Sequence, residues 1–203
     1  MAGASAGEVP YLDEAAVMAL LPAGAILDTR LDADINGDGF PDTAVMGGGE
    51  RERRLVVVLA MRGGHAPPQS ARLPAPATSG ADISVDAGML VVLDASGDDI
   101  ETRTAYRYRF EPGSRRMRLM SIEAARYSGA DQERVLKLDW DLVSGGQRLA
   151  RGNIDASAAD GDQYRYAAPV HGQHPTEPVY MEDTPDPNTL IDAAQRTLPV
   201  DGG

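Results

Sequence analysis

Period-two alternation of apolar and polar side chains, in runs separated by short turns, most constrains how this chain can fold. In residues 104–110, tyrosine and phenylalanine alternate with arginine, as they do along a half-buried β-strand. A turn at residues 111–114, with proline in its second position, leads to a second such run at residues 116–122. Because strands joined by short turns pair antiparallel, the sequence predicts an antiparallel meander rather than a parallel sheet.

The same reasoning extends along most of the chain. Asp13 is suited to cap a short helix over residues 14–21, which Pro22 would end. Further strands are expected at residues 25–31, 43–46, 54–61, 83–85, 89–93, 136–142 and 147–150. We therefore expect a mainly β fold, sandwich-like or partial propeller-like, with one short N-terminal helix.

The last quarter of the sequence differs in composition. Residues 155–203 hold six of the 14 prolines, and nine acidic residues against two basic ones. Hydrophobic periodicity is weak there, except for a possible short helix over residues 189–196. We therefore expect a β domain over residues 1–154 and an irregular, acidic, Pro-rich tail over residues 155–203 that is partly docked and partly flexible.

One short segment carries a specific chemical signal. Oxygen-bearing side chains alternate from residue 34, a glycine stands at the sixth position, and another aspartate stands at the ninth. Calcium takes six to eight hard oxygen ligands, whereas zinc and copper favour nitrogen and sulfur, and magnesium demands stricter octahedral geometry. The predicted calcium ligands are Asp34, Asn36, Asp38 and Asp42 through their side chains and Phe40 through its carbonyl.

An EF-hand would place a bidentate glutamate at position 12, where this chain has Val45. The loop instead runs into an apolar strand, and in this it resembles the integrin-type FG-GAP or VCBS-like calcium loop. A single copy is present, and one loop does not make a propeller of several blades. More loosely, the whole chain resembles small exported bacterial β proteins with one such loop. That resemblance implies structural calcium and a periplasmic or extracellular location, and it implies no established reaction.

Composition excludes several classes of function. A formal charge of −12 argues against a nucleic-acid partner, and no apolar run is long enough to span a membrane. The absence of cysteine removes disulfide scaffolds, zinc ribbons and thiol nucleophiles. The sequence also contains no phosphate-binding loop and no zinc-protease motif. An enzymatic role is therefore disfavoured, although spatially paired carboxylates leave no sequence motif.

Arginines on the alternating strands offer a weaker signal. Arg107, Arg109, Arg116 and Arg118 are expected on one face of the sheet. The simplest interpretation is a solvated face paired with acidic side chains, and the alternative is a patch for an anion such as an acidic glycan.

Three functions follow from these observations. The leading hypothesis is a calcium-stabilised, non-enzymatic β domain of the bacterial cell envelope that binds a protein or glycan partner. The first alternative is a hydrolase acting on an envelope polymer, and the second is a structural intracellular β protein.

Overall fold

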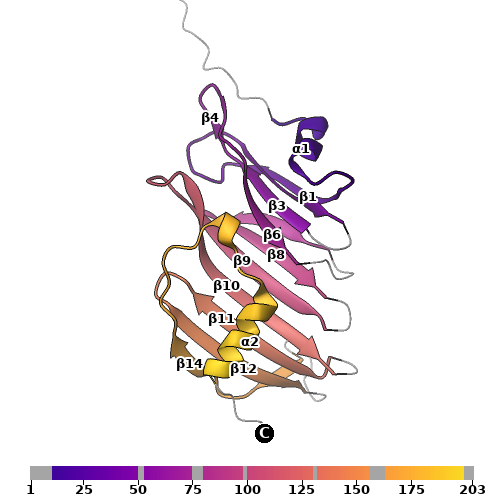
Figure 1. Ribbon diagram of the computed structural model, residues 1–203, viewed down its shortest axis with the longest axis vertical. Coiled ribbons are helices and arrows are strands. Elements are labelled where there is room, and N and C mark those ends of the chain that lie inside the picture. Colours follow the sequence, from indigo (N-terminus) through magenta and orange to yellow (C-terminus); the bar gives the residue numbers. More distant parts are fainter. Residues whose placement is uncertain are drawn as a thin grey trace, which may run out of the picture.

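The computed structural model describes residues 11–49, 53–74, 80–97, 100–129, 132–155 and 163–198. In these residues the chain is mainly β, with antiparallel strands in two large sheets and one short α-helix near each end of the chain (Figure 1). The predicted fold class is confirmed. None of the helices in the described residues is long and apolar enough to cross a membrane.

The smaller sheet has four antiparallel strands in the order β1-β2-β3-β6. They are β1 (Ile26–Ala33), β2 (Asp42–Gly48), β3 (Arg53–Val58) and β6 (Gln69–Leu73). The short helix α1 (Glu14–Leu20) packs on one face of this sheet through Val17, and Asp13 caps it by accepting the Ala16 N–H at 2.8 Å. Alternate residues of β2 and β3 therefore face α1 on one side and the main core on the other.

The larger sheet is a meander of eight strands. Seven of them follow one another along the chain: β7 (Asp82–Asp86), β8 (Met89–Ser96), β9 (Thr102–Glu111), β10 (Arg116–Ser128), β11 (Arg134–Asp141), β12 (Gly146–Ile154) and β13 (Tyr164–Tyr166). The eighth, β14 (Val170–Gln173), pairs with the part of β12 that β13 leaves open. A separate two-stranded hairpin joins β4 (Ala60–Met61) to β5 (Gly64–His65).

The turn between β7 and β8 lies between two of the expected strands and depends on adjacent residues. Ala87 and Gly88 have φ values of 48° and 72°. Two successive positive φ angles characterise the turn that matches the right-handed twist of hairpin strands.

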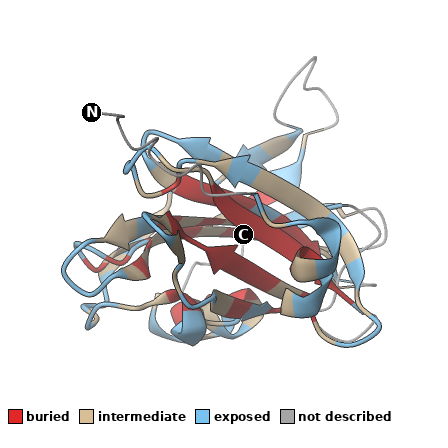
Figure 2. Cartoon of the chain, turned by 90° about the horizontal axis from the view of Figure 1, so that it is seen from above, coloured by how far each residue is buried: buried red, intermediate tan, exposed pale blue. Residues whose placement is uncertain are grey.

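One face of the larger sheet carries the main core. Tyr106, Tyr108, Leu119, Ile122 and Leu138 are fully buried on it. The smaller sheet covers this face over one part, and the C-terminal segment covers it over the rest (Figure 1). In Figure 2 the buried residues accordingly lie in the facing strands, and the exposed ones lie mainly in loops and outer elements.

The C-terminal segment is more regular than its sequence predicts. Residues 163–198 form β13, β14, the 3₁₀ helix η1 (Met181–Asp183) and the helix α2 (Pro187–Thr197). The helix expected over residues 189–196 is confirmed, with Asp186 accepting the Thr189 N–H as its cap. Outside this helix the apolar side chains of the segment are few and widely spaced, but Met181 is buried in the main core together with Ile191 and Ala194 of the helix. The apolar sheet face beneath them explains why this segment is ordered.

A buried ion pair links the two sheets. Arg53 of β3 is only 2% exposed, pairs with Asp94 of β8, and lies 3.5 Å from Asp28 of β1. It also donates to the carbonyl of Ala95 at 2.9 Å. Burial lowers the pKa of the Arg53 guanidinium, and the carboxylate of Asp28 opposes that effect.

Candidate functional site

The predicted calcium loop connects β1 to β2 and is held together by its own backbone. One carboxylate oxygen of Asp34 accepts the N–H groups of Gly37 and Asp38, at 2.8 and 3.0 Å, and the other accepts that of Gly39 at 2.9 Å. Gly37 and Gly39 have φ values of 77° and 85°, in the left-handed region that favours glycine. These contacts curl the chain tightly around the Asp34 side chain.

Asn36 and Asp38 lie beside one another in the same loop. The Asn36 amide donates to one oxygen of Asp38 at 3.0 Å, and the other Asp38 oxygen accepts the N–H of Phe40 at 2.9 Å. Asp34 and Asp38 are exposed, and neither forms an ion pair with an arginine or lysine among the described residues. The structure thus brings three of the predicted ligand side chains together on the solvent side of the loop.

Asp42 lies on the opposite, buried side. Its carboxylate is fully buried and accepts the N–H groups of Ile35, Asn36 and Ala60, at 2.8, 3.1 and 2.7 Å. Burial raises the pKa of the Asp42 carboxyl above its ordinary value of 3.8, and the three N–H groups oppose that rise. Asp42 therefore fastens the loop to the start of β4, a role that its place in the sequence motif did not indicate.

An alternative ligand set would start two residues earlier, at Asp32. A ligand set starting at Asp32 is disfavoured, because Asp32 already pairs with Arg30 at 2.8 Å and accepts the Thr43 hydroxyl at 2.7 Å. The set starting at Asp34 has no such competing cation. This difference favours the register that the sequence predicted.

The side-chain oxygens of the loop suit a hard cation, but hydrogen bonds already occupy many of their acceptor positions. A carboxylate offers about four acceptor positions, and the hydrogen bonds above occupy three of them at Asp34 and at Asp42 but only two at Asp38. Among the described residues, no three histidine, cysteine, aspartate or glutamate side chains are grouped to hold a metal. The calcium ligands therefore remain a prediction, in which Asp38 has the most free acceptor capacity.

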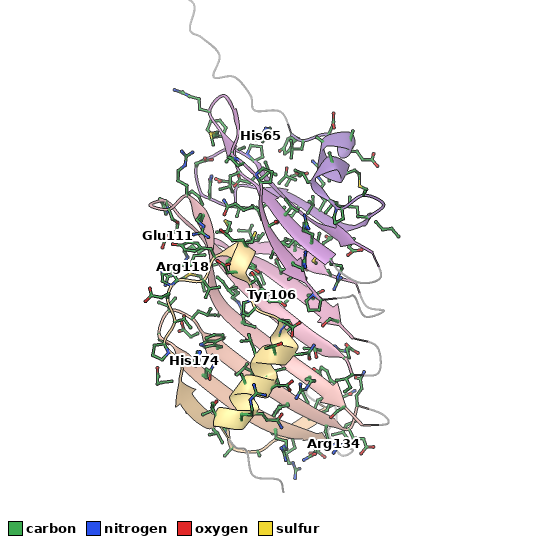
Figure 3. The ribbon with its side chains drawn as sticks, viewed as in Figure 1. His65, Tyr106, Glu111, Arg118, Arg134 and His174 are labelled. Carbon is green, nitrogen blue, oxygen red and sulfur yellow. The ribbon has the colours of Figure 1, made fainter. Side chains whose placement is uncertain are left out.

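The loop forms one wall of a cleft between the two sheets, which we call the junction cleft. Its volume is about 620 Å³. Its lining includes Asn36 and Asp38 of the loop, the β4–β5 hairpin with the prolines after it, and Phe110, Arg115 and Arg116 around the β9–β10 turn. His65, labelled in Figure 3, marks the hairpin at this end of the molecule.

Two arginines at the β9–β10 turn make part of the lining of the junction cleft basic. Arg116 pairs with Glu182 and stacks on Tyr180, with 3.6 Å between the guanidinium carbon and the ring centroid. Arg115 has no carboxylate partner in the described part of the chain and only approaches the Met61 sulfur, at 4.0 Å. The lining of the cleft thus combines one carboxylate, two arginines and several apolar side chains. No local sequence pattern could have found it, because its walls come from three separate segments.

The arginine face of β9 and β10 is largely neutralised, as the simpler interpretation predicts. Arg107 lies 2.5 Å from Glu123, Arg118 lies 3.5 Å from Glu111, and Arg116 pairs with Glu182. Figure 3 shows Glu111 and Arg118 side by side. Arg109 is the exposed member of the set.

Comparison of the chain with protein-family models, with curated proteins and with solved structures gave no match. Function must therefore be inferred from the residues themselves.

Proposed function

We propose that this chain is a calcium-stabilised, non-enzymatic β domain of the bacterial cell envelope, periplasmic or extracellular, that binds a protein or glycan partner in the junction cleft. One observation carries the proposal: the exposed carboxylate of Asp38 lines that cleft beside Asn36, and among the described residues it pairs with no arginine or lysine. A divalent ion bound there would neutralise Asp34 and Asp38 and stiffen the wall that a partner meets.

The lining favours binding over hydrolysis. Asp38 is the single carboxylate among the described residues that line the cleft. Glycoside hydrolysis ordinarily uses two carboxylates that flank the scissile bond. The prolines and Phe110 instead offer apolar contact area to a partner. Arg115, which meets no carboxylate of the described residues, offers a guanidinium group that can bind an anion.

Calcium binding is tested by calorimetric titration and by thermal unfolding with calcium, with magnesium and with a chelator. We expect calcium to raise the melting temperature and to slow amide exchange over residues 32–46, because bound ligand stabilises the folded state. Asp38→Asn should abolish both effects. Asp82→Asn, which changes an exposed aspartate on β7 outside the loop, should retain them. A melting curve that calcium and chelator leave unchanged in the wild type would contradict the metal assignment.

Partner binding is tested separately with an array of bacterial envelope glycans and a displayed peptide library. His65→Trp places a large side chain at the rim of the cleft, whereas Ala23→Trp adds the same bulk at an exposed turn elsewhere. We expect His65→Trp alone to lose the ligands that the wild type selects. Equal binding by both variants would show that the cleft is not the binding surface.

A further inference from the structure

A second concentration of charge lies at the end of the larger sheet that is farthest from the junction cleft. Arg126 of β10 faces Leu136 of β11, which in turn faces Arg151 of β12, so the two arginines share one face of the sheet. Arg134 lies two residues before Leu136 on that same face. Figure 3 labels Arg134 at this end and His65 at the other. We call this cluster of Arg126, Arg134 and Arg151 the arginine basin.

The basin is a pocket and not merely a run of surface charge. It encloses about 380 Å³ beside α2, with Val135 and Leu136, both buried, among its lining residues. Hydrogen-bond donors complete its lining: the Ser128 hydroxyl and the side-chain amides of Asn153 and Gln195.

The charge in the basin is poorly compensated. Arg126 lies 2.6 Å from Asp192 of α2 and donates to the Gln195 oxygen at 3.3 Å. Arg134 and Arg151 pair with no carboxylate in the described part of the chain. Most arginines on the opposite face of the same sheet are paired, and the whole chain carries a charge of −12. Abundant acid elsewhere makes this surplus of cationic donors unusual.

The chemistry of the lining identifies the kind of ligand that would complete it. Guanidinium groups bind phosphate oxygens through two parallel hydrogen bonds, and these charge-assisted bonds are roughly twice as strong as neutral ones. Arg126 is held by Asp192, whereas the guanidinium groups of Arg134 and Arg151 meet no carboxylate of the described residues. Gln195 keeps its amide N–H₂ available because its oxygen already accepts a hydrogen bond from Arg126. The pocket lies within the usual size range for small-molecule sites and exceeds the volume of a bare ion.

We propose that the arginine basin binds a phosphate group, either as free phosphate or as the phosphate of a small phosphorylated ligand. Arg134 and Arg151 bind the phosphate oxygens, Asn153 and Gln195 donate the remaining hydrogen bonds, and the buried side chain of Leu136 lies between Arg126 and Arg151 on the same face. This site is independent of the calcium loop and of the junction cleft, so either proposal can fail without the other.

The test is calorimetric titration of the full chain at low ionic strength with inorganic phosphate and, separately, with glucose 6-phosphate. We expect saturable binding of at least one probe. Arg134→Gln and Arg151→Gln should each weaken it about tenfold or more, since each removes a charged hydrogen bond. Asp192→Asn should leave binding unchanged or tighten it, because it removes the one carboxylate that competes for Arg126.

Arg148→Gln is the matched control, because Arg148 projects from the opposite face of the same strand as Arg151. It should bind as the wild type does. Tighter binding of glucose 6-phosphate than of phosphate would identify a ligand-borne phosphate, and equal binding would identify the free ion. No heat with either probe, or an equal loss in Arg148→Gln, would overturn the proposal. Arg134 is exposed, so its variant keeps the test valid if Arg151→Gln fails to fold.

Discussion

The Asp34–Asp42 loop and the arginine basin lie at opposite ends of the molecule and collect charge in opposite ways. The loop gathers its carboxylates within nine consecutive residues, where backbone N–H groups solvate them without any cation. The basin takes one arginine from each of three strands, and of these only Arg126 meets a carboxylate within the described ranges. A carboxylate can be satisfied by the backbone of its own turn, whereas clustered guanidinium groups depend on solvent, a carboxylate or a ligand.

The largest expected effect is the difference in stability lost when the buried Arg53 and the basin residue Arg151 are each replaced. Arg53→Met should cost about 3–5 kcal/mol in unfolding free energy, because it leaves the buried carboxylate of Asp94 without its partner. Arg151→Met in the basin should cost no more than about 0.5 kcal/mol, since no carboxylate loses a partner. Urea denaturation measures both.

A double variant separates lost pairing from lost packing. Arg53→Met combined with Asp94→Leu should recover most of the stability, because apolar replacements of a buried ion pair are often neutral. If Arg53→Met and Arg151→Met lose the same unfolding free energy, the basin arginines stabilise the fold as Arg53 does, and the proposed difference between the two sites is wrong.

The second prediction concerns the two sides of the loop. Asp42→Ala should cost about 3 kcal/mol or more, because it leaves three N–H groups at a fully buried position without an acceptor. Asp38→Ala, on the exposed side of the same loop, should cost about 0.5–1 kcal/mol in the absence of calcium, since water replaces its contacts. Similar losses in urea denaturation would show that the buried and exposed sides are not energetically distinct.

Local patterns account for what the sequence could predict. The β9–β10 hairpin, the turn at Ala87 and Gly88, and the curl around Asp34 each depend on residues close together in the chain. Alternation and turn chemistry are properties of such short windows, so the meander and the loop could be anticipated.

The arginine basin could not be anticipated, because the register of β10, β11 and β12 determines which arginines meet. The regular structure of the C-terminal segment could not be predicted for a similar reason. The side chains that it buries in the main core, Met181, Ile191 and Ala194, are scattered among acidic residues and prolines, and the apolar face of the larger sheet gives them a partner. The second role of Asp42 depends likewise on Ala60, which lies on another strand.

The third prediction uses the raised pKa of Asp42. The folded state holds the Asp42 proton more tightly than the unfolded state does, so stability falls as pH rises from 3.8 through the raised pKa. Wild type should therefore lose stability relative to Asp42→Asn across that interval. Asp141, whose pKa is lowered by the N–H groups of Ser144 and Val143, should behave oppositely: its contribution is present above 3.8 and is lost as pH falls. Denaturation curves at a series of pH values distinguish the two signs.

The smallest expected effect on stability comes from electrostatic repulsion among the arginines of the basin. Replacing both Arg134 and Arg151 with glutamine should raise stability by roughly a few tenths of a kcal/mol at low salt, since partly solvated like charges repel weakly. Sodium chloride should erase this advantage, because the screening length falls to about 10 Å at 0.1 M. Sodium phosphate at matched ionic strength should go further and make the wild type the more stable protein, because a bound anion stabilises only the chain that retains its ligands. If phosphate and chloride act alike on both chains, the basin is a screened patch of charge and not a site; if the double variant is less stable in every salt, its arginines serve the fold.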